Sequence, residues 1–154
     1  TSITNIELTT KTMFDSYSYL MWQSEWMYRD MDGDKYTYPT IDNTSIFNTA
    51  TLVKKQAGYY TQLIYAIDKN YKVGARYDNI YKNDVIANGN NNNEPDKLKA
   101  YNIKLDYKHS EYSSFRVQYS HEDYLYNEDG NKKPMDSLMF TMNFAIGSHP
   151  AHSF

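Results

Sequence analysis

The chain has 154 residues, no cysteine and a formal net charge of −3, and it carries 17 Tyr, 6 Phe and 2 Trp at a mean hydropathy of −0.81. This charge supplies no basic field for nucleic acid, and the lack of cysteine excludes disulfide, iron–sulfur and thiolate chemistry. No apolar run approaches the roughly 20 residues that a membrane-spanning helix needs, so helical insertion is excluded as well.

The first two segments have the period of a β-strand. Apolar and polar residues alternate in residues 3–14 and more clearly in residues 18–29, where Trp22 and Trp26 lie opposite Glu25. A helix would space its apolar residues by three and four positions. The spacing of two therefore predicts two strands, separated by a short turn.

A polar stretch containing Asp-Gly, Pro and Asn/Thr residues follows and predicts a long loop over residues 30–56. Alternation returns over residues 58–67 and continues after a tight reversal at 68–70, which predicts a hairpin. Residues 81–97 contain the run NGNNNNEPDK, which has no means of burying a core. They predict a second long loop.

The last third of the chain repeats this pattern. Residues 98–108 alternate, and a short turn leads to a second alternating segment around Val117. A third long loop is predicted at 123–135. The final segment, 135–154, begins with a clear alternation and ends on Phe154. The count is about seven strands.

Short turns and long loops alternate along the whole chain, and the strands are about ten residues long. Transmembrane β-barrels combine both properties, with short periplasmic turns, long extracellular loops and strands of roughly 9–11 residues. The sequence therefore predicts an all-β fold, a transmembrane antiparallel up-and-down β-barrel in the bacterial outer membrane with its C-terminus in the periplasm. An open sheet in lipid leaves unpaired edges, so we expect residues 1–154 to be the C-terminal portion of one barrel domain that further strands complete.

The two faces of these strands predict two environments. Aromatic residues near the strand ends would form interfacial girdles, namely Trp22, Trp26, Tyr28, Tyr59, Tyr77, Tyr101 and Tyr119. Charged residues of the polar faces would line a lumen and select solutes by charge, or else neutralise one another; they are Glu25, Arg29, Lys72, Arg76, Asp78, Lys104, Asp106 and Arg116.

Three stretches carry a family resemblance: LMWQSEWMYRDMDGDKY, AGYYTQLIYAIDKNYKVGARYDNIY and FTMNFAIGSHPAHSF. They contain the pair Tyr28 and Arg29, the hairpin from Gly58 to Asp78, and the ending from Gly147 to Phe154. The chain resembles the C-terminal part of Gram-negative outer-membrane barrel proteins described as porin-like or as zinc-regulated and TonB-dependent-receptor-like. The resemblance implies passage or uptake of a small solute or metal species across the outer membrane.

Metal ligands and an assembly signal are expected near the C-terminus. His149 and His152 are candidate ligands for a divalent metal such as zinc, with a role at the periplasmic rim or in assembly as the alternative. Phe144, Ile146 and Phe154 are the candidate assembly signal of the final strand. Asp30, Asp32 and Asp34 alternate in the first predicted loop as oxygen ligands do in calcium loops, or they belong to an ordinary acidic loop.

The predicted function is a porin-like channel or receptor. The alternative is a structural or adhesive surface barrel whose long loops bind glycans or partner proteins. No Ser, His and acid grouping stands at a nucleophile turn, so no enzymatic activity is expected. Expected partners are outer-membrane lipid and lipopolysaccharide, the barrel assembly machinery, a small solute and further copies of the chain, without nucleic acid. Because Thr1 opens directly into strand-like sequence without a signal peptide, we expect a mature chain or a piece of a longer one.

Overall fold

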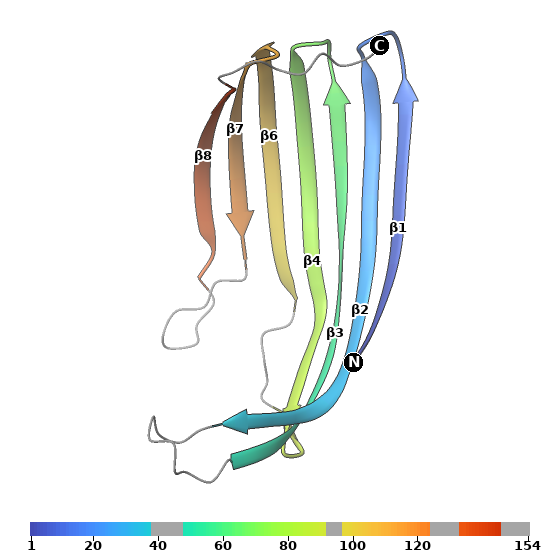
Figure 1. Ribbon diagram of the computed structural model, residues 1–154, viewed down its shortest axis with the longest axis vertical. Coiled ribbons are helices and arrows are strands. Elements are labelled where there is room, and N and C mark those ends of the chain that lie inside the picture. Colours follow the sequence, from blue (N-terminus) through green and yellow to red (C-terminus); the bar gives the residue numbers. More distant parts are fainter. Residues whose placement is uncertain (38–47, 92–96, 124–132, 146–154) are drawn as a thin grey trace.

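In a computed structural model the chain folds into one antiparallel β-sheet, described for residues 1–37, 48–91, 97–123 and 133–145 (Figure 1). The sheet order is β1-β2-β3-β4-β6-β7-β8, with β5 paired to β4. The strands are β1 (Ser2–Met13), β2 (Tyr19–Thr37), β3 (Asn48–Ala66), β4 (Tyr71–Ala87), β5 (Asn90–Asn91), β6 (Leu98–Ser110), β7 (Ser113–Glu122) and β8 (Met135–Phe144).

The predicted all-β, antiparallel, up-and-down architecture is confirmed, because every long strand pairs with its neighbour in the sequence. The sheet is open. β1 and β8 form its two edges, and no backbone pairing of the described residues joins them. Closure into a transmembrane barrel stays a prediction.

Two predicted loop boundaries are wrong. β2 and β3 pair without interruption out to Thr37 and Asn48, so most of 30–56 is strand. β4 likewise continues to Ala87 and turns back into β5. Inter-strand hydrogen bonds use the backbone and not the side chains, so a polar sequence extends a strand wherever a paired neighbour supplies the register.

The remaining boundaries are only partly described. Residues 38–47, 92–96 and 124–132 lie outside the described part of the chain, as do 146–154. The final strand is described from Met135 to Phe144, a shorter span than the predicted 135–154.

The three predicted short turns lie together at one end of the sheet, at the top of Figure 1, which we name the turn end. Asp15 closes the first turn by accepting the backbone N–H groups of Tyr17 at 2.8 Å and Ser18 at 2.7 Å. Asp68 closes the second in the same way, accepting those of Asn70 and Tyr71 at 2.7 and 2.8 Å. At the opposite, extended end, β2, β3 and β4 continue past β6, β7 and β8.

A β-bulge interrupts the pairing of β3 with β4 where this extension begins. Gly58 pairs with Ile80 whereas Ala57 pairs with Lys82, so Tyr81 is an extra residue in β4. A Cβ on Gly58 would lie 2.9 Å from the carbonyl oxygen of Asn79, so only glycine fits this close backbone approach.

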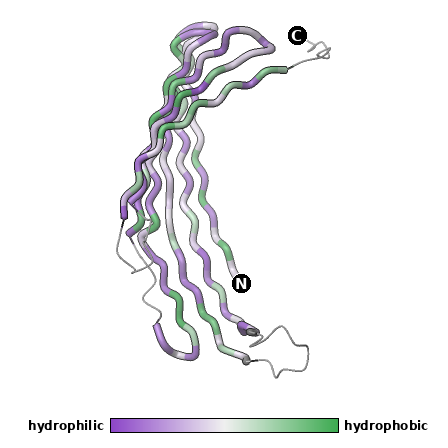
Figure 2. The backbone as a smooth tube through the Cα atoms, turned by 90° about the vertical axis from the view of Figure 1, so that its left-hand side faces the viewer, coloured by the Kyte–Doolittle hydropathy of each residue, from purple (hydrophilic) through white to green (hydrophobic). Residues whose placement is uncertain are grey.

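The register assigns every second residue to one of two faces. We name the face that carries most of the large apolar side chains the apolar face. The opposite face, which carries Glu25, Asp78 and Asp106, is the polar face. The sheet is a single curled layer (Figure 2), and most of its buried side chains lie on the polar face, among them Ile64, Ala66, Val85, Ala100 and Ser120. Side chains converge on the inside of a curve, so the polar face is the concave one.

Candidate functional site

The apolar face exposes large side chains on neighbouring strands. Leu63 on β3 is 47% exposed, Ile103 on β6 is 62% exposed and Phe140 on β8 is 68% exposed. Continuous apolar surfaces of this kind are rare on monomeric proteins in water and mark an interaction surface. The apolar face is therefore a candidate surface for contact with lipid or with another protein.

An aromatic row bounds this face near the turn end. The rings of Tyr71 and Tyr107 lie 4.8 Å apart, those of Tyr107 and Phe115 6.2 Å, and those of Phe115 and Phe144 5.9 Å. The row crosses β4, β6, β7 and β8. We name it the turn-end row.

A second row, the far row, crosses the same face and consists of Trp26, Tyr59, Tyr77 and Tyr101. Ring centroids are 6.0 Å apart for Tyr59 and Tyr77 and 5.0 Å for Tyr77 and Tyr101. Trp26 donates its indole N–H to the hydroxyl of Tyr81 at 2.6 Å. The rows are six residues apart on β4 and on β6, which is about 20 Å along the strands.

Beyond the far row the same face becomes charged. The register places Asp30, Asp32 and Asp34 there on β2, and the ion pair of Lys82 with Asp84, 3.6 Å apart, on β4. The expectation that these aspartates belong to a loop is wrong, because β2 continues through them. The apolar part of this face thus ends at the far row. We name the region between the turn-end row and the far row the apolar belt.

The polar face carries an acidic row near the level of the far row. The register aligns Glu7, Glu25, Asp78 and Glu122 across the sheet. Asp78 accepts hydrogen bonds from the guanidinium of Arg76, at 2.9 and 3.0 Å from Nε and at 2.6 Å from Nη2. The acidic row borders a hollow of about 660 Å³ on the polar face.

A cation–π contact and two side-chain hydrogen bonds lie next to the acidic row. The guanidinium carbon of Arg76 lies 3.9 Å from the ring centre of Tyr60, a cation–π contact. In the next row toward the turn end, Gln62 donates to Gln23 at 2.9 Å and Ser120 donates to Asn102 at 2.6 Å. The middle of the polar face therefore consists of hydrogen-bonded amide and hydroxyl groups together with Arg76, whose charge Asp78 balances.

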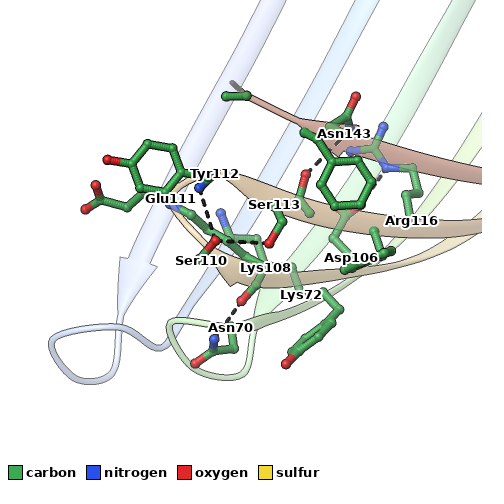
Figure 3. Close-up of a pocket in the computed structure, with 15 residues that line it drawn as sticks. Asn70, Lys72, Asp106, Lys108, Ser110, Glu111, Tyr112, Ser113, Arg116 and Asn143 are labelled. Carbon is green, nitrogen blue, oxygen red and sulfur yellow. Dashed lines mark hydrogen bonds and ion pairs between the residues drawn. The ribbon is translucent and has the colours of Figure 1, made fainter. Parts of the chain in front are cut away.

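Nearer the turn end the polar face becomes basic. Lys72, Asp106 and Arg116 stand in one register row, and the Nε of Arg116 donates to Asp106 at 2.5 Å. Lys104 lies 3.9 Å from the same carboxylate. Figure 3 shows Lys72, Asp106 and Arg116 among the residues that line a hollow of about 430 Å³ at this end.

All eight residues predicted to line a lumen lie on the polar face. One of them, Arg29, has a buried Nε atom without a hydrogen-bond partner among the described residues. Phe144 of the predicted assembly signal belongs to the turn-end row, whereas Ile146, Phe154, His149 and His152 lie outside the described residues. Trp22 and Tyr119 of the predicted girdles lie between the two rows instead.

The turn of Asp15 shows one electrostatic effect outside the strands. Its two backbone hydrogen bonds, from Tyr17 and then Ser18, hold the pKa of the Asp15 carboxyl below its ordinary value. The negative charge therefore stabilises this turn.

A cluster of side chains at the β8 edge of the sheet was not predicted from the sequence. Asp136 on β8 accepts a hydrogen bond from the hydroxyl of Tyr119 at 2.6 Å, and Nδ1 of His121 lies 2.8 Å from the same oxygen. Asp123 is 3.5 Å from the other ring nitrogen. The cluster could have been predicted only from the register of β7 against β8, which pairs His121 with Asp136. Within the described ranges, no three His, Cys, Asp or Glu residues gather closely enough to hold a metal ion.

Comparisons with known proteins give little further guidance. The chain is 36% identical over 154 residues to an uncharacterized protein of Aquifex aeolicus (strain VF5), and the match covers 100% of this chain but 31% of that protein. The chain thus spans about a third of the length of the curated relative it matches. No family model matches, and no solved structure matches. The described residues include no helix long and apolar enough to cross a membrane.

Proposed function

We propose that this chain forms part of the wall of an outer-membrane β-barrel that lets a small solute pass. The observation that carries the proposal is the apolar belt, about 20 Å along the strands, between two aromatic rows, with polar side chains on the opposite face. Outer-membrane barrels have an outward apolar band between two aromatic girdles and a polar interior. In a soluble protein the apolar face of such a sheet would be buried against a core and the polar face would be exposed to water.

The proposed orientation follows from the two ends. The turn end faces the periplasm, because short turns lie on that side of outer-membrane barrels. Past the far row, Asp32, Lys82 and Asp84 stand on the outward face, where a side chain would meet headgroups or water. β2, β3 and β4 then project outside the cell.

The open edges of β1 and β8 are compatible with this proposal if further strands close the barrel. Each unpaired backbone group in lipid costs several kcal/mol, so closure is required. The Aquifex relative is about three times as long as this chain, which leaves room in that protein for such strands. The zinc-regulated, TonB-dependent-receptor-like identity stays a proposal from sequence resemblance, as does a metal role for His149 and His152.

Two measurements test the membrane proposal. The full-length protein, purified in mild detergent, should migrate differently on SDS gels before and after boiling, as folded outer-membrane barrels do. In lipid vesicles, brominated acyl chains should quench Trp22 in a Trp26→Phe variant more strongly than Trp26 in a Trp22→Phe variant. Trp22 lies inside the belt and Trp26 at its border. A protein that stays in solution without detergent, with neither effect, would refute the proposal.

A surface-adhesion function is the second candidate. The strands β2, β3 and β4 extend beyond the far row, and β4 ends in the exposed turn of Asn88 and Gly89. Such an extension suits contact with glycans or other proteins. Single-channel recording separates the two functions, since a pore conducts ions in a planar bilayer and an adhesive barrel without an open lumen does not.

A further inference from the structure

The polar face has a basic region near the turn end, where Lys104 and Arg116 share the carboxylate of Asp106. We propose that it binds the anionic group, a carboxylate or a phosphate, of the solute that passes. This inference rests on the proposed function. We name the region the basic zone and define it by Lys11, Lys72, Lys104, Arg116 and Asp106.

The charge of the basic zone is unbalanced. Four cationic side chains share one carboxylate, and Asp106 is already held by Arg116 at 2.5 Å and approached by Lys104 at 3.9 Å. Neither Lys11 nor Lys72 has an ion pair among the described residues. The hollow at this end is also lined by Lys108 and Glu111, whose opposite charges offset each other. About three positive charges therefore remain to attract an anion.

Gly74 and the ring of Tyr19 lie against three of these cations. Lys104 lies across Gly74, where a Cβ would meet its Cε at 2.9 Å. Tyr19 attracts two ammonium groups, that of Lys11 at 4.1 Å from the ring centre and that of Lys72 at 5.6 Å. Cation–π contacts hold a charge in place without neutralising it.

The zone also offers space and neutral donors. The hollow in Figure 3 is bordered by Lys72 and Arg116 and by the side chains of Asn143 and Ser114, which can donate to an oxyanion. Arginine and lysine side chains around an open space are the usual partners of carboxylates and phosphates.

The acidic row does not cancel this field. Asp78 lies four residues from Gly74 and six from Lys72 on β4, about 13 and 20 Å along the strand. Salt screens exposed charges over about 8 Å at physiological ionic strength. Arg76 already neutralises Asp78, so the acidic row is weaker than its count of carboxylates suggests.

Titration calorimetry on the folded full-length protein in detergent tests the inference, with inorganic phosphate and succinate as separate probes. A Lys72→Gln/Lys104→Gln variant should weaken binding about tenfold, which corresponds to about 1.4 kcal/mol. The Lys72→Arg/Lys104→Arg variant should keep the affinity, and Lys82→Gln, on the other face, should not change it. The tighter of the two probes identifies the anionic group.

The outcomes separate this inference from the proposed function. If neither anion binds, or if the glutamine variant binds as tightly as the wild type, the anion site is refuted. If the wild type binds phosphate or succinate as expected but conducts no ions in a planar bilayer, the anion site stands and the pore is refuted.

Discussion

Replacing Ile103 by arginine distinguishes a membrane sheet from a soluble one. Ile103 lies in the apolar belt two residues from Tyr101 and four from Tyr107, about 7 and 13 Å along the strand from the two aromatic rows. An arginine on the lipid face near the bilayer midplane costs about 2–4 kcal/mol. In water the same change, at a side chain 62% exposed, would alter stability by less than about 0.5 kcal/mol.

Urea unfolding of the full-length protein in phospholipid vesicles, followed by tryptophan fluorescence, measures this difference. Asn79→Arg is the matched control, because Asn79 pairs with Tyr59 of the far row, where arginine should cost only about 0–1 kcal/mol. An Ile103→Arg loss no larger than that of the control would refute the assignment of the apolar face to lipid.

Two further predictions concern the bulge and the first turn. Gly58→Val should destabilise the fold by about 1–3 kcal/mol in the same assay, because its Cβ would lie 2.9 Å from a backbone oxygen. Gly33→Ala is the control, because open space surrounds Gly33. Equal unfolding midpoints for the two variants would contradict the packing argument. The pKa of Asp15 is lower in the folded state than its ordinary value, so its stabilisation is present above the unfolded pKa of about 3.9 and is lost as the pH falls through the folded value. Asp15→Asn should therefore lower stability at pH 7 and make little difference at pH 2, and a loss that does not depend on pH would contradict this cause.

The local alternation of side chains predicted most of the strands and their faces. Within one regular strand, residues two apart point the same way, so the sequence placed Arg76 with Asp78 and Lys104 with Asp106. The short turns were also predictable, since Asp15 and Asp68 carry turn chemistry in their own side chains.

The wrong loop boundaries have a different origin. Residues 30–37 and 81–87 are rich in turn-forming and charged residues, yet they are strands because a neighbour lies beside each of them. In β4 the bulge opposite Gly58 also shifts the register against β3, and this shift is not readable from either strand alone. Backbone pairing across the sheet overrode local propensity.

The sequence by itself determined that this protein is all-β, which residues share a face, and where the chain turns tightly. These properties depend on neighbours one to four positions away. The tertiary structure decided which charges meet, because the register brings together residues far apart in the sequence. It aligned the two aromatic rows, lengthened β2, β3 and β4, brought His121 to Asp136, and laid Lys104 over Gly74 beside Lys72.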